Sequence, residues 1–368
     1  MRDGNPDSVP LSDFTRDVAA TTGVDVEKLA GRAGATEYDT LLDDARHRRD
    51  PDVVESAEDL PESLRRVLDS YPDALQLLMW TDLAEFEASI HGIAMRDIRG
   101  ELVAVPSKDE IAATLEENAE LYEQKVAEGF DRLLLVPFGM PTENLLEKVG
   151  GFLASIARTE RLANGGGQTI GLNRGFFRDP IAHFRESEAV ARQLSYCTEP
   201  DAPHRFTHTK EGIVSEDPAA GWQAILVEDV NKLDLVEMPG SAEARPLRLN
   251  RPRLLGGTTS QVALERLAGW QYRGEAGLTI ESYLMMMLDA AQRYKVLLDV
   301  RGGCPLLGAY DSGSHTFDML SWEDDTTEDF PLLTAKRYPL YKTENILVRD
   351  PRTCVPIVSS YTPASGAD

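Results

Sequence analysis

Apolar residues recur at every third or fourth position through much of the first 96 residues. The spacing is clearest in residues 60–68 and 75–94, and Pro61 and Pro72 interrupt it. Because an α-helix turns once every 3.6 residues, this spacing puts the apolar side chains on one helix face. The pattern predicts a helical N-terminal region over residues 1–96.

Between residues 97 and 220, short apolar runs alternate with amphipathic stretches. The runs at 97–105 and 131–139 are typical of strands. Ser107 and Glu110 have the spacing of a capping box, in which each side chain accepts a hydrogen bond from the other residue's backbone amide. The order strand, helix, strand, helix predicts a mixed α/β domain over residues 97–220.

Two helices are expected in this middle domain. The first begins at Ser107 and ends at Gly129, because glycine is frequent just after a helix. The second covers residues 143–161. The apolar residues that share one face of the first helix are Ile111, Leu115, Tyr122 and Val126.

Residues 221–356 are expected to form a compact C-terminal α+β domain, followed by a flexible tail at 357–368. Within this domain the pattern predicts a strand at 221–230 and a helix at 279–298 that ends at Gly302 and Gly303. Short strands and turns are expected after the helix.

The helix at 279–298 carries one apolar stripe, with Met285–Met287 in the middle of the helix. Methionine could bind a soft metal or a partner, but at helical spacing it usually fills a core. We expect these methionines to be core residues. Together the three regions predict an α+β protein.

The chain carries 62 acidic and 38 basic residues, a formal charge of −24, and only nine of the basic residues are lysine. Such a surface repels nucleic acids and anionic membranes, so neither is expected as a partner. One basic cluster stands out, and we interpret it as a proline-punctuated loop that pairs with the acids around it. It consists of Arg245, Arg248, Arg251 and Arg253.

No stretch of about 18 uncharged apolar residues is present to span a bilayer, and the first residues lack the apolar run of a secretory signal. The expected location is therefore the cytoplasm. Cys197, Cys304 and Cys354 are odd in number and far apart. This arrangement predicts reduced thiols, with no disulfide framework and no zinc motif.

Motifs for catalysis or cofactor binding are sparse. The glycines of residues 164–172 match neither a Walker loop nor a dinucleotide fingerprint and predict a turn into a short strand; no G-x-S-x-G nucleophile elbow is present. Cys197, His204 and His208 could hold zinc, but two prolines in this segment favour a loop. No cofactor and no metal are expected.

Residues 308–325, GAYDSGSHTFDMLSWEDD, interleave aromatic, small polar and acidic residues. An EF-hand beginning at Asp311 is excluded, because Gly313, His315 and Trp322 occupy positions that need oxygen ligands. Disorder is disfavoured because the stretch holds several large apolar residues. A solvated acidic turn is the simplest interpretation, and a looser calcium site stays open at Asp324, Asp325, Glu328 and Asp329.

Four segments, in the same order along residues 105–355, resemble an uncharacterised group of bacterial hypothetical proteins for which no activity is established. The last part of the chain resembles the C-type-lectin-like fold of formylglycine-generating-enzyme relatives and of retroelement-diversified variable proteins. In this resemblance Trp322 is the loop tryptophan and residues 346–355 are the final strand. The four segments are 125–141 (KVAEGFDRLLLVPFGMP), 221–230 (GWQAILVEDV), 274–284 (GEAGLTIESYL) and 307–310 (LGAY).

The lectin-like resemblance implies a non-enzymatic protein that displays loop side chains on a rigid scaffold. Rigid aromatic residues and adaptable small polar residues suit that role, since they give contact area at a low entropy cost. The partner would be an unidentified protein or small ligand. The predicted ligand-binding residues are Tyr310, Asp311, Ser312, Ser314, His315, Trp322, Tyr338 and Tyr341.

Two other functions stay open. A hydrolase or metal-dependent enzyme would use Glu228, Asp229 and His204 or His208, although adjacent strand residues point to opposite faces. A structural subunit of a phage particle or another large assembly would need no catalytic motif. The sequence does not predict an oligomeric state.

Overall fold

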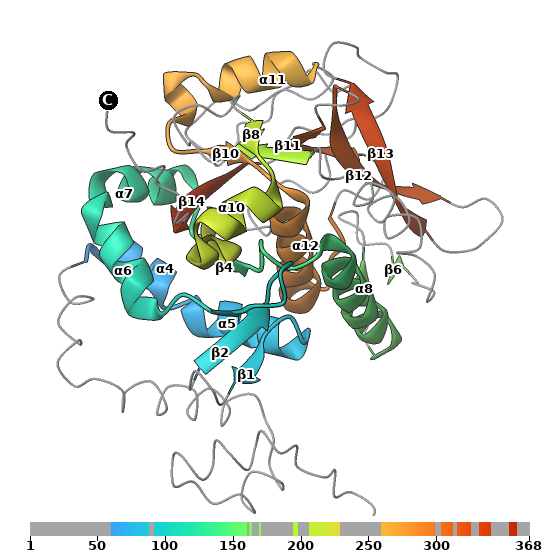
Figure 1. The fold of residues 1–368 in the computed structure, drawn as a ribbon, viewed down its shortest axis with the longest axis horizontal. Helices are drawn as coiled ribbons and strands as arrows, with labels where there is room; N and C mark the ends of the chain where they lie inside the picture. The colour runs from blue at the N-terminus through green and yellow to red at the C-terminus, as the bar shows by residue number, and fades with distance from the viewer. Residues whose placement is uncertain are drawn as a thin grey trace, which may run out of the picture. The chain divides into compact units, whose positions relative to one another are not determined.

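The computed structural model divides the chain into two compact units, Met1–Leu60 and Pro61–Asp368. The helical pattern predicted before residue 60 lies outside the described residues (Figure 1). The structure describes residues 60–87, 92–159, 162–163, 169–170, 194–197, 206–228, 259–298, 303–311, 315–324, 331–339 and 353–358.

The second unit begins with two helices and a small sheet. Helices α4 (Glu62–Leu68) and α5 (Tyr71–Trp80) bury their apolar faces, as the periodicity predicts. Strands β1 (Glu85–Glu87), β2 (Gly92–Arg96) and β3 (Leu102–Ala104) follow and pair antiparallel in that order.

The helical prediction for residues 75–94 is wrong beyond Trp80. The Thr81 hydroxyl donates to the Leu77 carbonyl at 2.7 Å, and Asp82 has a left-handed backbone with φ 54°. A left-handed residue cannot continue a right-handed helix, so the chain turns there and enters β1.

Helix formation after β3 follows the predicted capping box. Ser107 Oγ accepts from the Glu110 amide, and a Glu110 carboxylate oxygen accepts from the Ser107 amide at 2.7 Å. The single helix predicted to Gly129 is two helices, α6 (Lys108–Glu117) and α7 (Ala119–Glu128), because Asn118 leaves the helical conformation at φ −128°. Gly129 ends α7 with φ 111°, as predicted.

The predicted strands at 131–139 and 221–230 are confirmed as β4 (Arg132–Val136) and β9 (Gln223–Val227). They pair antiparallel, from Arg132 opposite Val227 to Val136 opposite Gln223. The sheet continues through β14 (Thr353–Val358) to β10 (Ala276–Gly277), giving the order β10-β14-β9-β4. Strands from both sides of residue 220 therefore share one sheet.

A second sheet holds the C-terminal hairpins. Its order is β13 (Pro331–Pro339), β12 (Thr316–Asp324), β11 (Gly303–Asp311), β7 (Leu194–Cys197) and β8 (Phe206–His208), all antiparallel. Short strands are thus present where the C-terminal domain was predicted. Most of the predicted tail, from residue 359, lies outside the described residues.

Helix α8 (Thr142–Thr159) matches the second helix predicted in the middle region. It leads to a two-stranded pair, β5 (Leu162–Ala163) with β6 (Thr169–Ile170). The glycine-rich turn predicted between these strands lies outside the described residues.

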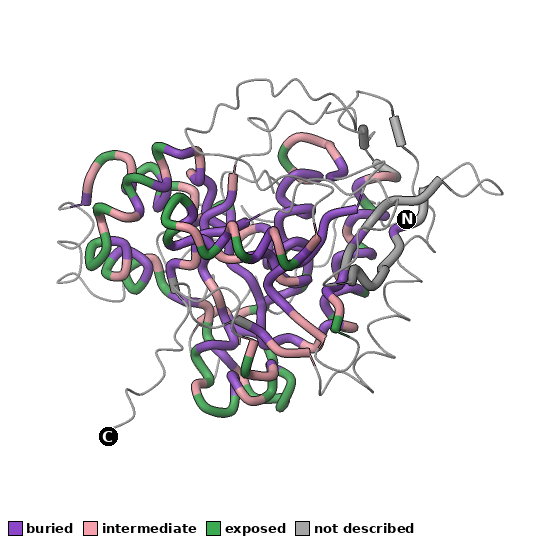
Figure 2. The backbone as a smooth tube through the Cα atoms, turned by 90° about the horizontal axis from the view of Figure 1, so that it is seen from above, coloured by how far each residue is buried: buried purple, intermediate pink, exposed green. Residues whose placement is uncertain are grey.

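Helix α12 (Ile280–Tyr294) is the central element of the unit and contacts α8, β4 and β11 (Figure 1). The predicted apolar stripe is buried, and burial extends to every residue from Ile280 to Ala291. The core position of Met285–Met287 is confirmed, since each residue is at most 2% exposed. The contacts of α12 with α8, β4 and β11 explain this burial. Buried residues run through the interior of the described part of the molecule (Figure 2).

The end of α12 also differs from the prediction. Lys295, with a left-handed φ of 56°, caps the helix seven residues before the predicted stop at Gly302. Lysine rarely adopts this conformation, whereas glycine adopts it readily. The sequence therefore favoured Gly302 and Gly303 as the end of the helix.

The α+β class is confirmed, but the mixed α/β arrangement of the middle region is corrected. Strands β3 and β4 flank α6 and α7 yet lie in different sheets. Every strand pair in the described ranges is antiparallel, so this strand-helix-strand order does not form a parallel βαβ unit.

Two glycines let the two larger sheets approach each other. A Cβ on Gly277 of β10 would lie 2.5 Å from the Leu307 carbonyl carbon, and a Cβ on Gly308 of β11 would lie 2.4 Å from the Gly277 oxygen. The Gly308 amide donates to the Leu278 carbonyl at 2.9 Å. Since any side chain would push these backbones apart, only glycine fits at either position.

We expect Gly308→Ala to lower the free energy of unfolding by about 3 kcal/mol or more, because the new methyl group overlaps backbone that cannot move aside. Urea unfolding followed by circular dichroism measures the change. Gly151→Ala is the matched control: this exposed glycine of α8 has open space around its Cβ position. It should gain about 0.5–1 kcal/mol from helix propensity. Equal effects of the two substitutions would contradict the close approach.

Candidate recognition surface

Three aromatic rings from different strands meet at one end of the five-stranded sheet. Phe206 of β8, Tyr310 of β11 and Phe317 of β12 have ring centroids 5.2–5.6 Å apart. Ala263 and Leu264 of α11 (Ser260–Leu267) pack in the same cluster. Phe317 is buried, whereas Phe206 and Tyr310 are half-buried and reach solvent.

The hydrogen bonds around Tyr310 hold its side chain in one place. Its backbone is paired on both sides, opposite Phe317 in β12 and Ser195 in β7. The phenol oxygen lies 2.7 Å from Nδ1 of His315, which is exposed and has a left-handed φ of 55°. Ring packing and this hydrogen bond fix both ends of the tyrosine side chain.

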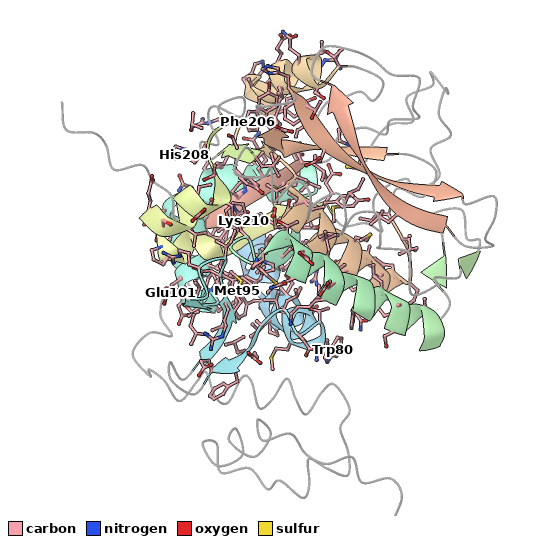
Figure 3. All side chains as sticks on the ribbon, turned by 45° about the vertical axis from the view of Figure 1, so that its right-hand side comes forward. Trp80, Met95, Glu101, Phe206, His208 and Lys210 are labelled. Carbon is pink, nitrogen blue, oxygen red and sulfur yellow. The ribbon has the colours of Figure 1, made fainter. Side chains whose placement is uncertain are left out.

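Polar residues follow the aromatic ones along both strands. On β8, the exposed Thr207 hydroxyl lies 2.7 Å from Nδ1 of half-buried His208. Figure 3 labels Phe206 and His208 on this strand. Half-buried Asp311 follows Tyr310 in β11. We name Phe206, Tyr310 and His315 the Tyr310 surface, which offers aromatic contact area together with a hydroxyl and an imidazole group.

The structure places two of the predicted ligand-binding residues, Tyr310 and His315, together on this surface. A third, Asp311, follows Tyr310 in β11. Two more belong to neighbouring strands, where the Cα of Trp322 is opposite Leu333 and that of Tyr338 is opposite Phe317. Their side chains lie outside the described part of the molecule, and so do Ser312, Ser314 and Tyr341.

The residues considered for catalysis are only partly described. Glu228 follows β9 in the four-stranded sheet, and His208 ends β8 in the five-stranded sheet. His204 and Asp229 lie outside the described residues. Over the ranges that the structure describes, no group of three His, Cys, Asp or Glu side chains could hold a metal ion.

Sequence patterns did not reveal a buried ionic network between α7 and the four-stranded sheet. Lys125 Nζ donates to Glu128 at 2.8 Å and to Glu275 at 2.9 Å. The hydroxyl of Thr353, the first residue of β14, donates to the second Glu275 oxygen at 2.6 Å. Lys125 and Glu275 are both 0% exposed. Because 150 residues separate the partners, no local spacing could have predicted the pair.

A second buried network joins the N-termini of α8, α12 and α10 (Lys210–Glu216). Lys210 Nζ donates to Glu281 at 2.5 Å, to the Thr142 hydroxyl at 2.9 Å and to the Met140 carbonyl at 3.1 Å. The second Glu281 oxygen is buried and has no hydrogen-bond partner among the described residues.

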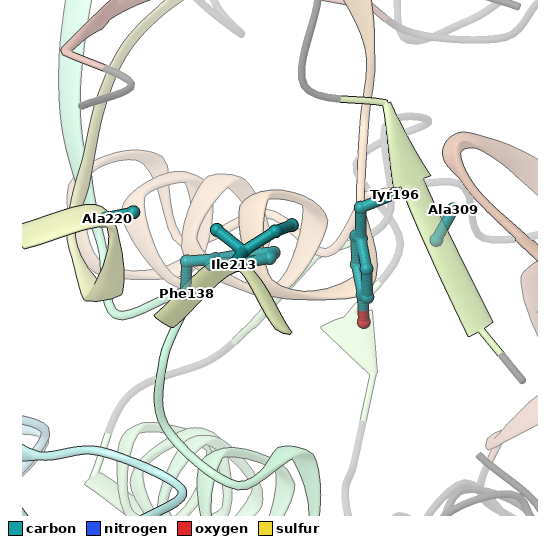
Figure 4. Packing of buried hydrophobic residues seen from close by; sticks show 5 residues of the cluster. All are labelled: Phe138, Tyr196, Ile213, Ala220 and Ala309. Carbon is teal, nitrogen blue, oxygen red and sulfur yellow. The ribbon is translucent and has the colours of Figure 1, made fainter. Parts of the chain in front are cut away.

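Aromatic residues pack beside this network. The Phe138 ring lies 5.6 Å from Lys210 Nζ and meets Tyr196 edge to face at 4.9 Å (Figure 4). Through its ion pair with Glu281 and its bonds to Met140 and Thr142, Lys210 ties α10 to the first turns of α8 and α12.

Four segments singled out in the sequence meet through these contacts. Segments 125–141 and 274–284 supply Lys125 and Glu275. Segments 125–141 and 221–230 pair as β4 and β9, and segments 274–284 and 307–310 meet at the glycine crossing of β10 and β11. These four segments therefore help to build the interior.

Comparison of the chain with protein-family models, with curated proteins and with solved structures finds no match. Within the described ranges, no helix combines the length and the apolar character needed to cross a bilayer.

Burial keeps the Cys354 thiol protonated. Cys304 and Cys354 are both buried. Burial, and then the negative charge of Glu275, raise the pKa of the Cys354 thiol to about 12. The thiolate is the reactive form of cysteine, so Cys354 is expected to be inert in the folded chain.

Labelling with Ellman's reagent at pH 8 tests this expectation in a Cys197→Ser variant, which removes the cysteine whose side chain is not described. Cys304 and Cys354 should react at least about 100-fold more slowly in the folded chain than in guanidinium, since the thiolates are few and inaccessible. Adding Ala268→Cys, at an exposed position, supplies the rate of an accessible thiol. Rapid reaction of either native thiol in the folded chain would contradict the burial.

Proposed function

We propose that this chain is a non-enzymatic recognition protein that binds a ligand or partner through the Tyr310 surface. One observation carries the proposal: the Tyr310 ring is packed against Phe206 and Phe317, its hydroxyl is held by His315, and part of it still reaches solvent.

The physical advantage of such a residue is preorganisation. Binding orders side chains at an interface, and each rotamer-rich side chain that becomes fixed costs about 0.5–1.5 kcal/mol. Tyr310 and Phe206 are already fixed by neighbouring rings, so a ligand gains their contact area at little entropic cost. Exposed His315 adds a hydrogen-bonding group that can adapt to the ligand.

The C-type-lectin-like resemblance of the last part of the chain supports the same proposal. In that fold a packed scaffold displays tolerant side chains on loops at one end. Tyr310 and His315 lie on opposite sides of the connection between β11 and β12, which is the place expected for displayed side chains.

Glycan and peptide arrays test the function when they are screened with the wild-type chain and three variants. Isothermal titration then measures the affinity of each binder. Tyr310→Ala should weaken a wild-type binder by about 30-fold or more, as expected when a central aromatic anchor is lost. His315→Ala should weaken it less, because it frees the phenol but leaves the ring. The control is Trp80→Ala, on α5 and far from Phe206 in Figure 3.

Binders that keep their affinity within twofold in Tyr310→Ala and in His315→Ala would overturn the assignment of this surface. Chemical conversion of a bound molecule by the wild-type chain would overturn the non-enzymatic role.

A further inference from the structure

The most exposed large apolar side chain among the described residues is Trp270, at 84%. It begins the short 3-10 helix η3 (Trp270–Tyr272), which follows α11. For comparison, Trp80 is 43% exposed and Trp222 is fully buried. Tryptophan buries more than about 150 Å² when it is covered, and it is enriched among the residues that dominate binding energy at interfaces.

Backbone hydrogen bonds make the turn that carries Trp270 rigid. The Gly269 amide donates to the Arg266 carbonyl at 2.8 Å, and the Tyr272 amide donates to the Gly269 carbonyl at 2.9 Å. A Cβ on Gly269 would lie 2.9 Å from the Arg266 oxygen, so the turn needs glycine there. We name residues 268–273 the Trp270 turn.

Both sides of the Trp270 turn are fixed to the core. Tyr272 is buried against Leu267 of α11. The Glu275 amide donates to the Tyr272 carbonyl at 2.8 Å, and the Glu275 side chain is paired with buried Lys125. Trp270 is therefore presented by backbone that needs no ordering on contact.

The charges beside Trp270 have both signs. Glu265 on α11 and Arg273 after η3 are both exposed, and half-buried Arg266 lies between Glu265 and the turn. Elsewhere the chain is strongly acidic, with a formal charge of −24, so two copies repel each other over most of their surface. A patch with both signs can meet its own copy with opposite charges facing each other.

We propose that the Trp270 turn is the contact between two copies of this chain in a symmetric dimer. In a two-fold symmetric contact both copies use the same surface, so every pair of contacting residues occurs twice. Trp270 of each copy packs against the other turn, and Glu265 of one copy faces Arg273 of the other. This contact is independent of the proposed ligand binding.

A dimer would also have a consequence for recognition. Leu264 of α11 packs in the cluster beneath Tyr310, and Trp270 follows the C-terminal end of the same helix. Joining two copies through the turn therefore links two Tyr310 surfaces through α11. Two linked surfaces can bind a repetitive ligand with an avidity above the affinity of either surface.

Sedimentation equilibrium of the full chain tests the dimer. The wild-type chain should show a monomer–dimer equilibrium with a dissociation constant below about 100 µM. Trp270→Ala should weaken dimerisation at least about tenfold, because it removes the central apolar contact. Trp80→Ala, another exposed tryptophan, is the matched control and should dimerise like the wild-type chain.

A charge exchange makes the test specific to the proposed pairing. Glu265→Arg should weaken the dimer because it places two arginines opposite each other, and adding Arg273→Glu should restore it. Thermal unfolding midpoints within about 2 °C of the wild-type value confirm that each variant is folded. Any of three results would overturn the proposal. The wild-type chain could be monomeric at about 100 µM, Trp270→Ala could dimerise like the wild-type chain, or the charge exchange could fail to restore the dimer.

Discussion

The buried ion pair between Lys125 and Glu275 is the contact on which the rest of the unit depends. Both side chains are fully removed from solvent, and their atoms lie 2.9 Å apart. Two such charges are stable in an interior only when paired and hydrogen-bonded, and Glu128 and Thr353 supply the remaining partners. The pair fixes α7 against β10 and β14, so a helix of the middle region is held to strands from the C-terminal region.

Both proposed surfaces connect to the segment around Glu275. On its N-terminal side, the Glu275 amide donates to the Tyr272 carbonyl and so closes the Trp270 turn. On its C-terminal side, Gly277 touches Gly308, which precedes Tyr310 by two residues. The ion pair and the glycine crossing thus connect the interior to one exposed tryptophan and to one half-buried aromatic cluster. A recognition protein needs such rigid connections, because a loosely held aromatic residue would lose entropy on binding.

Local signals predicted local structure well. The capping box at Ser107, strands β4 and β9, helix α8 and the methionines of α12 were all predicted from short-range patterns and confirmed. The predictions failed where a single residue changes the backbone direction, at Asp82, Asn118 and Lys295, because apolar spacing does not report φ.

Long-range features could not be predicted from local patterns. The Lys125–Glu275 pair depends on residues 150 positions apart, and the exposure of Trp270 depends on what packs around it. For the candidate site, composition selected Tyr310 and His315, but Phe206 joined them only through strand pairing.

A double-mutant cycle on Lys125 and Glu275 tests this account most directly. The free energy of unfolding would be measured in urea for the wild-type chain, Lys125→Met, Glu275→Gln and the double variant. Lys125→Met alone leaves two buried carboxylates without their cation and should destabilise by about 3–5 kcal/mol. If the pair is buried and coupled, the double variant is less destabilised than the sum of the single variants by at least about 2 kcal/mol. Effects that add within about 0.5 kcal/mol would contradict the account, because independent sites behave in that way.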